Sequence, residues 1–304
     1  MGHSRNARPG ARSNFVNRSP ALVATFAAMS LCLSAQSIPA QTPARPDTVR
    51  VDKVQAGSVQ LDSNARKAPA SRRLHTPWVT GEFLEYTLKF GVVSAGSGRM
   101  QVMGRDTVRG RDTWHLKFDF SGGLPLMRVK DVFDSWIDAE THNSLRFEQH
   151  LSELGKKRDR VYQIFPDRAM FQLNDEPEKA SVPNPLDDAA FFYFIRTIPL
   201  EVGKSYDFNR YFDPKANPVT IRVLRKESVE VPAGKFDAIV IQPMIKTNGI
   251  FSEGGHAELW LSDDDRRILI QMKSKLAFGS LNLYLRKMTL PPLTVPDSGR
   301  GRTR

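Results

Sequence analysis

Apolar and polar residues alternate along most of the chain after Glu82. In residues 84–90 every second residue is apolar (Leu, Tyr, Leu, Phe), and the residues between them are polar. The same alternation returns in residues 114–120, 145–151, 219–223, 236–241, 257–261, 268–272 and 281–285. A period of two is typical of strands that bury one face, because successive side chains of a strand point to opposite sides. The pattern therefore predicts a mainly β protein.

Short turn sequences separate the predicted strands. They occur at residues 109–112 (RGRD), 166–167 (PD), 232–235 (PAGK) and 263–265 (DDD). Antiparallel strands can be joined by such turns, whereas parallel strands need long crossover connections. We therefore expect an all-β fold built on a large, curved antiparallel meander sheet, with a half-barrel or sandwich-like shape.

One segment departs from the alternating pattern. Residues 186–196 (LDDAAFFYFIR) follow two prolines, begin with two acids and end with a base. These are the residue preferences of helix starts and ends. We expect one short, very apolar helix near 186–196, with the two acids at its N-terminus and its aromatic side chains against the concave side of the sheet.

The first residues have the order of a secretory signal. Four arginines precede an apolar run at residues 21–33, and small residues follow, with cleavage sites after Ala35 and Ala40. The run is shorter than the ~20 apolar residues that cross a bilayer. Residues 1–35 are therefore predicted to be a signal peptide, with cleavage as late as residue 40 as the alternative.

The single cysteine, Cys32, lies inside the predicted leader. A lipoprotein signal needs a small residue before its cysteine, and here that residue is Leu31, so lipidation is the less favoured interpretation. Cleavage of the leader would leave the mature protein without cysteine. Disulfides, thiolate metal sites and cysteine nucleophiles would then be excluded together.

Composition divides the rest of the chain into three parts. Residues 36–75 and 289–304 are rich in small, proline and charged residues and are expected to be a disordered linker and a disordered tail. Residues 76–288 are expected to form a single β domain without a transmembrane span. The formal net charge is +11, but most of the surplus lies in the leader, linker and tail. The expected domain is nearly neutral, which argues against a nucleic-acid partner.

Several short motifs follow one another across the expected domain. They are residues 91–98, DVFDSWID at 131–138, DD at 187–188 leading into FYFIR at 192–196, PL at 199–200 with Gly203, VPAGKF at 231–236 and WLSDDDRR at 260–267. In this order they resemble the bacterial exported family of domain of unknown function 3108, over about residues 80–288. The resemblance implies a large antiparallel meander that curls into a half-barrel or sandwich. That family has no agreed activity, so the resemblance implies no mechanism.

Candidates for catalysis are weak in this sequence. Residues 92–96 (VVSAG) lack the first glycine of a serine-hydrolase elbow, and a glycine-rich bend of the sheet explains them better. Asp131, Asp134 and Asp138 lie around Trp136, an arrangement that a glycosidase could use. The last two acids share strand parity with the tryptophan, so one exposed polar strand face is the simpler explanation. No catalytic residue is assigned.

Histidines and acids show no spacing that favours a metal. His115 and His150 fall on the polar faces of predicted strands, and no two histidines form a short-spaced pair. The acids at 263–265 are expected to form a hairpin turn. Arg196 is expected to pair with an acid of 187–188 or of that turn. We expect neither a metal nor another cofactor.

Aromatic side chains are the strongest functional feature. A cluster such as residues 191–194 usually belongs to a core, but a curved sheet with an apolar inner face can also hold a ligand. The residues expected to contact such a ligand are Trp136, Phe191, Phe192, Tyr193, Phe194 and Trp260.

The leading hypothesis is a non-enzymatic protein of the periplasm or outer membrane that binds or carries a lipid or another apolar or amphipathic envelope molecule. One alternative is a structural or assembly factor that binds another envelope protein through an exposed sheet edge. A second alternative is an envelope hydrolase that uses Asp131, Asp134 or Asp138. The sequence does not define an oligomeric state.

Overall fold

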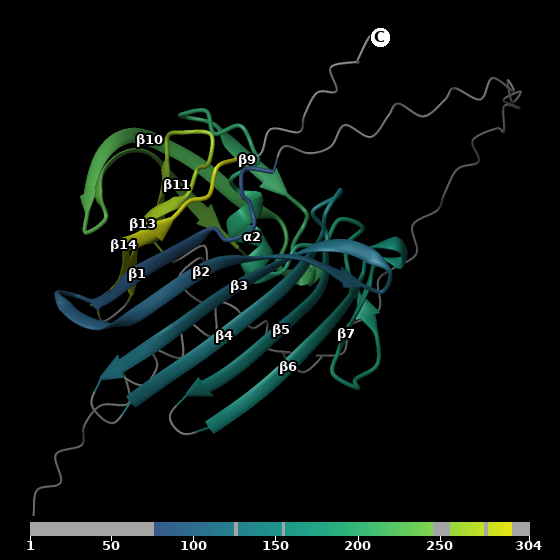
Figure 1. Cartoon of the computed structure of the whole chain (residues 1–304). Coiled ribbons are helices and arrows are strands. Elements are labelled where there is room, and N and C mark those ends of the chain that lie inside the picture. Colours follow the sequence, from purple (N-terminus) through teal and green to yellow (C-terminus); the bar gives the residue numbers. More distant parts are fainter. Residues whose placement is uncertain (1–75, 125–126, 154–155, 246–255, 277–278, 294–304) are drawn as a thin grey trace, which may run out of the picture.

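The computed structural model describes residues 76–124, 127–153, 156–245, 256–276 and 279–293. The predicted leader and linker, and most of the predicted tail, lie outside the described residues. The described chain forms one 14-stranded sheet with a single α-helix and two short 3-10 helices (Figure 1). Every pair of neighbouring strands is antiparallel.

The elements, in chain order, are β1 (Phe83–Phe90), β2 (Val93–Val108), β3 (Arg111–Leu124), β4 (Met127–Asp138), β5 (Ser144–Glu153), β6 (Lys156–Phe165), η2 (Pro166–Arg168), β7 (Met170–Leu173), β8 (Lys179–Ala180), α2 (Asp188–Phe194), β9 (Ser205–Phe208), η3 (Pro214–Ala216), β10 (Val219–Val231), β11 (Gly234–Met244), β12 (His256–Ser262), β13 (Leu269–Leu276) and β14 (Gly279–Thr289).

Two meanders make up the sheet. The first runs from β1 to β8 and the second from β9 to β14, and each strand pairs with its neighbour in sequence. Pairing of β1 with β14 joins the two meanders, so the first and last strands lie side by side in the middle of the sheet (Figure 1). The edge strands β8 and β9 do not pair, and the sheet is open. The predicted mainly β fold, with an antiparallel meander sheet and one short helix, is confirmed.

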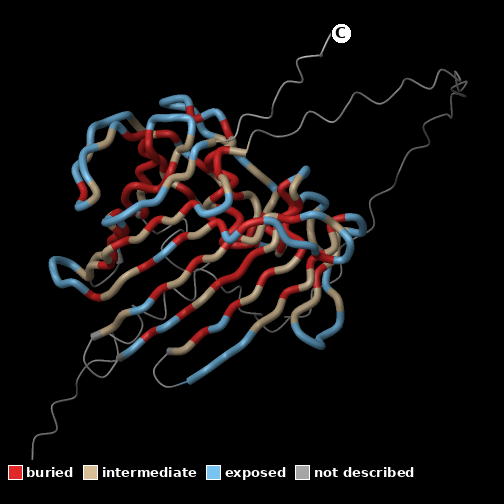
Figure 2. Tube along the Cα trace, in the orientation of Figure 1, coloured by how far each residue is buried: buried red, intermediate tan, exposed pale blue. Residues whose placement is uncertain are grey.

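Strand alternation separates an inner face, which carries the core, from an outer face. On β1 the inner residues Leu84, Tyr86 and Leu88 are buried, and the residues between them are partly exposed (Figure 2). The same face continues across the seam, where Tyr86 has Leu285 of β14 as its register partner. The Tyr86 hydroxyl donates a hydrogen bond of 2.9 Å to the Leu269 carbonyl at the start of β13. The two meanders therefore share one core.

The backbones of β2 and β3 approach closely at Gly96 and Gly122, which are register partners. A Cβ atom added at Gly122 would lie 2.1 Å from the Ala95 carbonyl oxygen. The neighbouring β1–β2 ladder shifts register between Leu88 and Lys89, beside the same part of β2. The glycine-rich stretch thus lets two strands cross closely where the sheet bends, as expected for glycine in a strand.

Gly122→Ala should therefore destabilise the domain by about 3 kcal/mol, because the added methyl group can be accommodated only by moving one backbone away from the other. Gly98→Ala is the matched control on the same hairpin. Its added Cβ would meet the flexible Phe120 ring at 3.2 Å, not a carbonyl, so a smaller loss is expected. Urea unfolding of both variants checks this, and equal midpoints would contradict it.

Candidate functional site

Aromatic rings cross the inner face of the first meander from strand to strand. This aromatic row consists of Phe118 and Phe120 of β3, Phe133 of β4, Phe147 of β5, Tyr162 of β6 and Phe171 of β7. Centroids of neighbouring rings lie 4.6–6.4 Å apart, and all six side chains are buried. These distances are typical of favourable aromatic contacts. The row is the largest continuous aromatic array among the described residues.

Helix α2 reaches the aromatic row at one end. The Phe192 ring stacks on Phe118, with centroids 5.5 Å apart and planes within 11°. Before the helix, the Asp187 carboxylate accepts a 2.6 Å hydrogen bond from the Ser135 hydroxyl of β4. The predicted contact of the helix with the concave side of the sheet is thus present in the structure.

The other aromatic residues of α2 lie in the core on its further sides. Phe191 is buried, and Tyr193 packs edge-on against Trp78, with centroids 5.4 Å apart. Phe194 packs edge-on against Phe208 of β9, at 5.0 Å. The helix therefore connects both meanders, and its contact with the aromatic row is made by Phe192.

Trp136 and Trp260, also predicted to contact a ligand, lie on the outer face. The Trp136 ring stacks on His115 of β3 at 4.4 Å, and the Arg146 guanidinium of β5 lies 5.1 Å from its centroid. Its indole N–H donates to Asp106 at 2.8 Å. Because the strand partners on both sides contact the ring, Trp136 is held within the sheet surface.

Trp260 has a similar environment on the second meander. Its indole N–H donates to Glu227 at 2.6 Å, and the cationic groups of Arg225 and Lys273 lie 5.7 and 5.2 Å from its ring. The Trp260 side chain leaves the sheet on the face opposite to Leu259 and Leu261, but it is only 4% exposed and belongs to the same hydrophobic core. The six predicted ligand contacts thus fall into separate places and do not form a single site.

The three aspartates around Trp136 do not converge either. Asp131 and Asp134 are three residues apart on β4, so their side chains leave opposite faces of the sheet. Asp134 accepts from His115 at 2.7 Å and pairs with Lys117 at 3.5 Å. Burial acts to raise the pKa of Asp134, but these two partners lower it below its usual value. Asp138 accepts from the backbone and hydroxyl of Thr141 and pairs with Arg111. These three aspartates therefore do not form a carboxylate pair of the kind that glycoside hydrolysis needs.

Asp134 and Asp138 share a face with Trp136, as strand parity predicted, but that face is not open around them. Both carboxylates are buried, at 7% and 5% exposure. Their neighbours on β3 cover them, since His115 and Arg111 reach across to bond them. The expectation of an exposed acidic face is therefore corrected to a face of cross-strand ion pairs.

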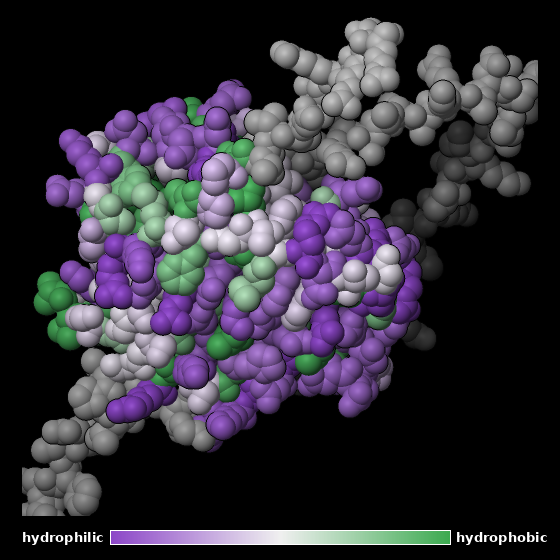
Figure 3. Space-filling view, viewed as in Figure 1, coloured by the Kyte–Doolittle hydropathy of each residue, from purple (hydrophilic) through white to green (hydrophobic). Residues whose placement is uncertain are grey.

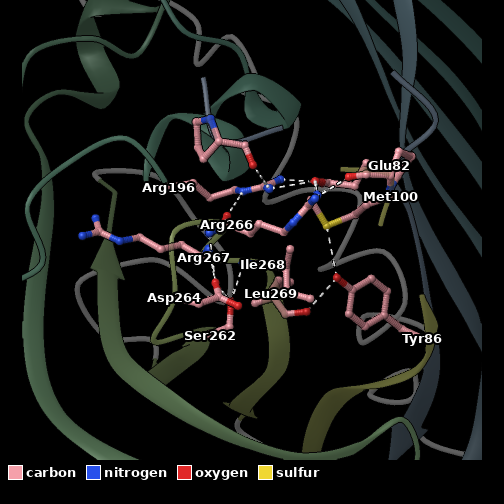
Figure 4. A network of polar contacts seen from close by, with 12 residues as sticks. Glu82, Tyr86, Met100, Arg196, Ser262, Asp264, Arg266, Arg267, Ile268 and Leu269 are labelled. Atoms are coloured by element: carbon pink, nitrogen blue, oxygen red, sulfur yellow. Dashed lines mark hydrogen bonds and ion pairs between the residues drawn. The ribbon is translucent and has the colours of Figure 1, made fainter. Parts of the chain in front are cut away.

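A buried ion pair fixes the C-terminal end of α2 to the start of the sheet (Figure 4). The Arg196 guanidinium donates to both carboxylate oxygens of Glu82, at 2.6 and 2.9 Å, and both side chains are 1% exposed. It also donates to the carbonyls of Pro77 and Arg266. The prediction that Arg196 pairs with an aspartate is wrong. Its partner is a glutamate that lies before β1, far away in sequence.

Two acids begin α2, and both are buried. Asp187 is the N-cap, and its carboxylate accepts from the Ala190 amide at 2.9 Å, as predicted from the sequence. Asp188 accepts from the Tyr211 hydroxyl at 2.8 Å. Burial raises the pKa of both carboxyls, and for Asp188 the rise is large because the single hydrogen bond offsets little of it.

His142 is a buried histidine whose ring lies 5.1 Å from Trp78. Burial and, less strongly, nearby Arg210 lower its pKa from 6.5 to about 4. Between these values the unfolded chain binds a proton that the folded chain does not, so stability should fall as pH falls from 6.5 to about 4. His142→Asn keeps a residue that tolerates the positive φ of 55° and removes the titration.

The variant should therefore lose less stability than the parent between pH 7 and pH 4. Chemical denaturation at a series of pH values measures this difference, and parallel curves would contradict it. Other acids titrate in both proteins, so their contribution cancels in the comparison.

Histidines on the outer face make cross-strand contacts, as strand parity predicted. His150 of β5 lies 2.8 Å from the Asp159 carboxylate of β6, and His115 of β3 contacts Asp134 of β4. Within the part of the chain that the structure describes, no group of three or more histidine, cysteine, aspartate or glutamate residues could hold a metal ion.

These features define an open, curved antiparallel β domain with an aromatic inner face and a shell of cross-strand ion pairs. A family model described as protein of unknown function (DUF3108) matches residues 85–286, and the chain belongs to this family. The resemblance inferred from the ordered motifs is confirmed. No curated protein matches the chain.

The solved structures to which the chain is similar include three bacterial proteins. A beta-barrel-like protein of domain of unknown function DUF1849 from Brucella abortus is 11% identical, covers 71% of this chain and 99% of its own, and has a TM-score of 0.49. A candidate lipoprotein from Parabacteroides distasonis (12% identity, coverage 70% and 98%) has a TM-score of 0.32. A candidate exported protein with a YmcC-like fold from Bacteroides fragilis is 12% identical, covers 71% of this chain and 99% of its own, and has a TM-score of 0.28.

None of the helices in the described part of the chain is long and apolar enough to cross a bilayer.

Proposed function

We propose that this protein is exported, acts in the periplasm or at the outer membrane, and binds an apolar or amphipathic envelope molecule on the inner face of its sheet without catalysing a reaction. The observation that carries the proposal is the aromatic row. Large curved sheets with an apolar inner face either fill that face with side chains or hold a ligand on it. Five neighbouring strands contribute rings to the row, and α2 contacts it near one end.

The part of the inner face beyond α2 suits a long molecule. Strands β3 to β6 continue well past the helix (Figure 1). Their inner residues there include Phe120, Val129 and Leu151, which are apolar and buried. An acyl chain gains about 0.8 kcal/mol for each CH₂ group that it removes from water, so contact with such a surface is favourable.

A polar group lies toward the β6 end of the aromatic row. Burial raises the pKa of the Tyr162 hydroxyl to about 12, although the neighbouring Arg160 guanidinium acts to lower that pKa. Arg160 is only partly buried. An apolar surface with a phenol and a guanidinium at one end favours an amphipathic ligand over a purely apolar one.

Mass spectrometry of organic extracts from the protein purified out of its native envelope tests the proposal. We expect one lipid or glycolipid class at a near-stoichiometric amount. An extract without any enriched lipid would overturn the proposal.

A pair of variants shows whether the inner face holds the lipid. Leu151→Trp fills the inner face, whereas Val132→Trp enlarges a neighbouring strand residue on the outer face. After both variants are shown to unfold cooperatively, the first should carry several-fold less lipid, and the second should carry as much as the parent. Equal loss in the two variants would place the lipid elsewhere.

A further inference from the structure

Strand β6 is longer than the strand that covers its outer edge. Along its β5 side it is paired from Lys156 to Gln163, whereas β7 pairs with it only from Tyr162 to Phe165. In the described part of the chain, the β7 register stops at Tyr162 and does not reach Lys157 or Asp159. Figure 1 shows this end of β6 as the outermost strand of the first meander, and Figure 2 shows it as exposed.

The direction of the backbone groups along the open edge follows from Val161, which adjoins Tyr162, the last residue paired with β7. Val161 donates its N–H to the Asn174 side chain and accepts from the Asn174 amide, both at 2.8 Å, so its polar groups point to the β7 side. Backbone groups alternate in direction along a strand. The N–H and C=O groups of Asp159 and Lys157 therefore point to the side of β6 on which β7 lies.

The side chains at this edge are mostly basic. Lys156, Lys157 and Arg158 are exposed and Arg160 is half-buried, while the one acid, Asp159, lies 2.8 Å from His150. The surrounding surface over β3 to β6 is largely hydrophilic (Figure 3), and its exposed residues include Arg128 and Lys130 of β4. A second copy of the chain paired through this edge would bring like charges opposite each other, which disfavours self-association.

We propose that the open edge of β6, residues 156–160, binds an extended acidic segment of another polypeptide as an added strand. The backbone groups supply the hydrogen bonds of strand addition, and the lysine and arginine side chains select acidic residues. An anionic membrane surface would neutralise the same charges. It would leave the ordered row of backbone donors and acceptors unused, and for this reason the polypeptide is favoured.

The test uses the mature protein and an eight-residue peptide that alternates glutamate with threonine. Titration followed by amide hydrogen exchange should show saturable binding and protection of the Lys157 and Asp159 amides. A peptide with lysine in place of glutamate should not bind. The glutamate peptide with methyl groups on alternate backbone nitrogens keeps its charge but should bind about fivefold more weakly or worse, because it loses strand hydrogen bonds.

A matched pair of variants tests the protein side. Asp159→Ala keeps the outward N–H, whereas Asp159→Pro removes it and leaves the hydrogen bonds to β5 in place. Proline is tolerated in an edge strand where the missing N–H would face solvent. The alanine variant should bind at least as well as the parent, and the proline variant about fivefold more weakly. If the proline variant does not fold, the methylated peptide decides the same point.

Three results would overturn the inference. They are absence of peptide binding, binding without protection of these amides, and equal binding of the methylated and unmethylated peptides. Binding to vesicles of anionic phospholipid without binding to the peptide would assign the basic edge to a membrane surface instead.

Discussion

Glu82→Gln should lower the free energy of unfolding by about 3–5 kcal/mol, because it leaves the Arg196 guanidinium buried without a countercharge. Both side chains of the pair are 1% exposed, so water cannot replace the lost carboxylate charge. The change should also release the end of α2 from the start of the sheet. Urea unfolding, followed by circular dichroism, measures the loss.

The same geometry provides two controls. Glu85→Gln removes an acid that pairs with Arg286 at the surface, where the arginine is 56% exposed, so the loss should stay within about 1 kcal/mol. Glu82→Leu combined with Arg196→Met replaces both charges by apolar groups and should regain a large part of the stability that either single change loses. Similar losses for Glu82→Gln and Glu85→Gln would show that burial of the pair has no energetic consequence.

Phe147→Ala should cost about 3–5 kcal/mol, because it opens a cavity in the middle of the aromatic row. Phe147 is fully buried, and its ring lies 6.3 Å from Phe133 and 5.8 Å from Tyr162. The neighbouring rings belong to two other strands, so the gap cannot close by movement of one side chain. Thermal or urea unfolding checks the loss.

Phe236→Ala is the control for this second prediction. Phe236 is partly buried on β11 and packs at the border of the core, so its removal leaves an opening that solvent can fill. A clearly smaller loss is expected. Equal losses would mean that the aromatic row contributes no more to stability than a peripheral ring.

Much of the fold could be predicted because it is encoded in local patterns. The alternation in residues 84–90 sets the inner and outer faces of β1, and the burial of Leu84, Tyr86 and Leu88 follows it. The acids before the aromatic run define the start of α2, where Asp187 is the N-cap. Turn residues at 109–112 and 232–235 lie at the hairpins β2–β3 and β10–β11. These features depend on neighbours in sequence, which a single chain reveals.

Contacts between distant residues could not be predicted in the same way. Nothing near Glu82 indicates that it faces Arg196, because the pairing depends on how the helix returns to the first strand. The surroundings of Trp136 depend on strand register, which places His115 on one side and Arg146 on the other. Its aromatic ring suggested a ligand platform, and only the register shows that both sides are covered.

The aromatic row was visible in the sequence only as separate strand residues. Phe118 and Phe147 each belong to an alternating run, and Phe133 belongs to the motif at residues 131–138. Their contact across the sheet requires that consecutive strands align with little offset, as the β3–β4 and β4–β5 registers show. A single sequence does not fix these offsets, since a slip of two residues preserves the alternation.

The seam between β1 and β14 determines the order in which this chain can complete its fold. Phe83 is paired with Thr289, so the middle of the sheet closes only when the last strand is present. A chain that emerges N-terminus first can form β1 to β8 hairpin by hairpin, while one side of β1 stays unpaired until β14 is made. The β1–β14 contact joins residues far apart in sequence, and such contacts slow folding. A circular permutant opened between β8 and α2 would join β14 to β1 through a short loop, convert the seam into a local hairpin, and fold faster than the natural order.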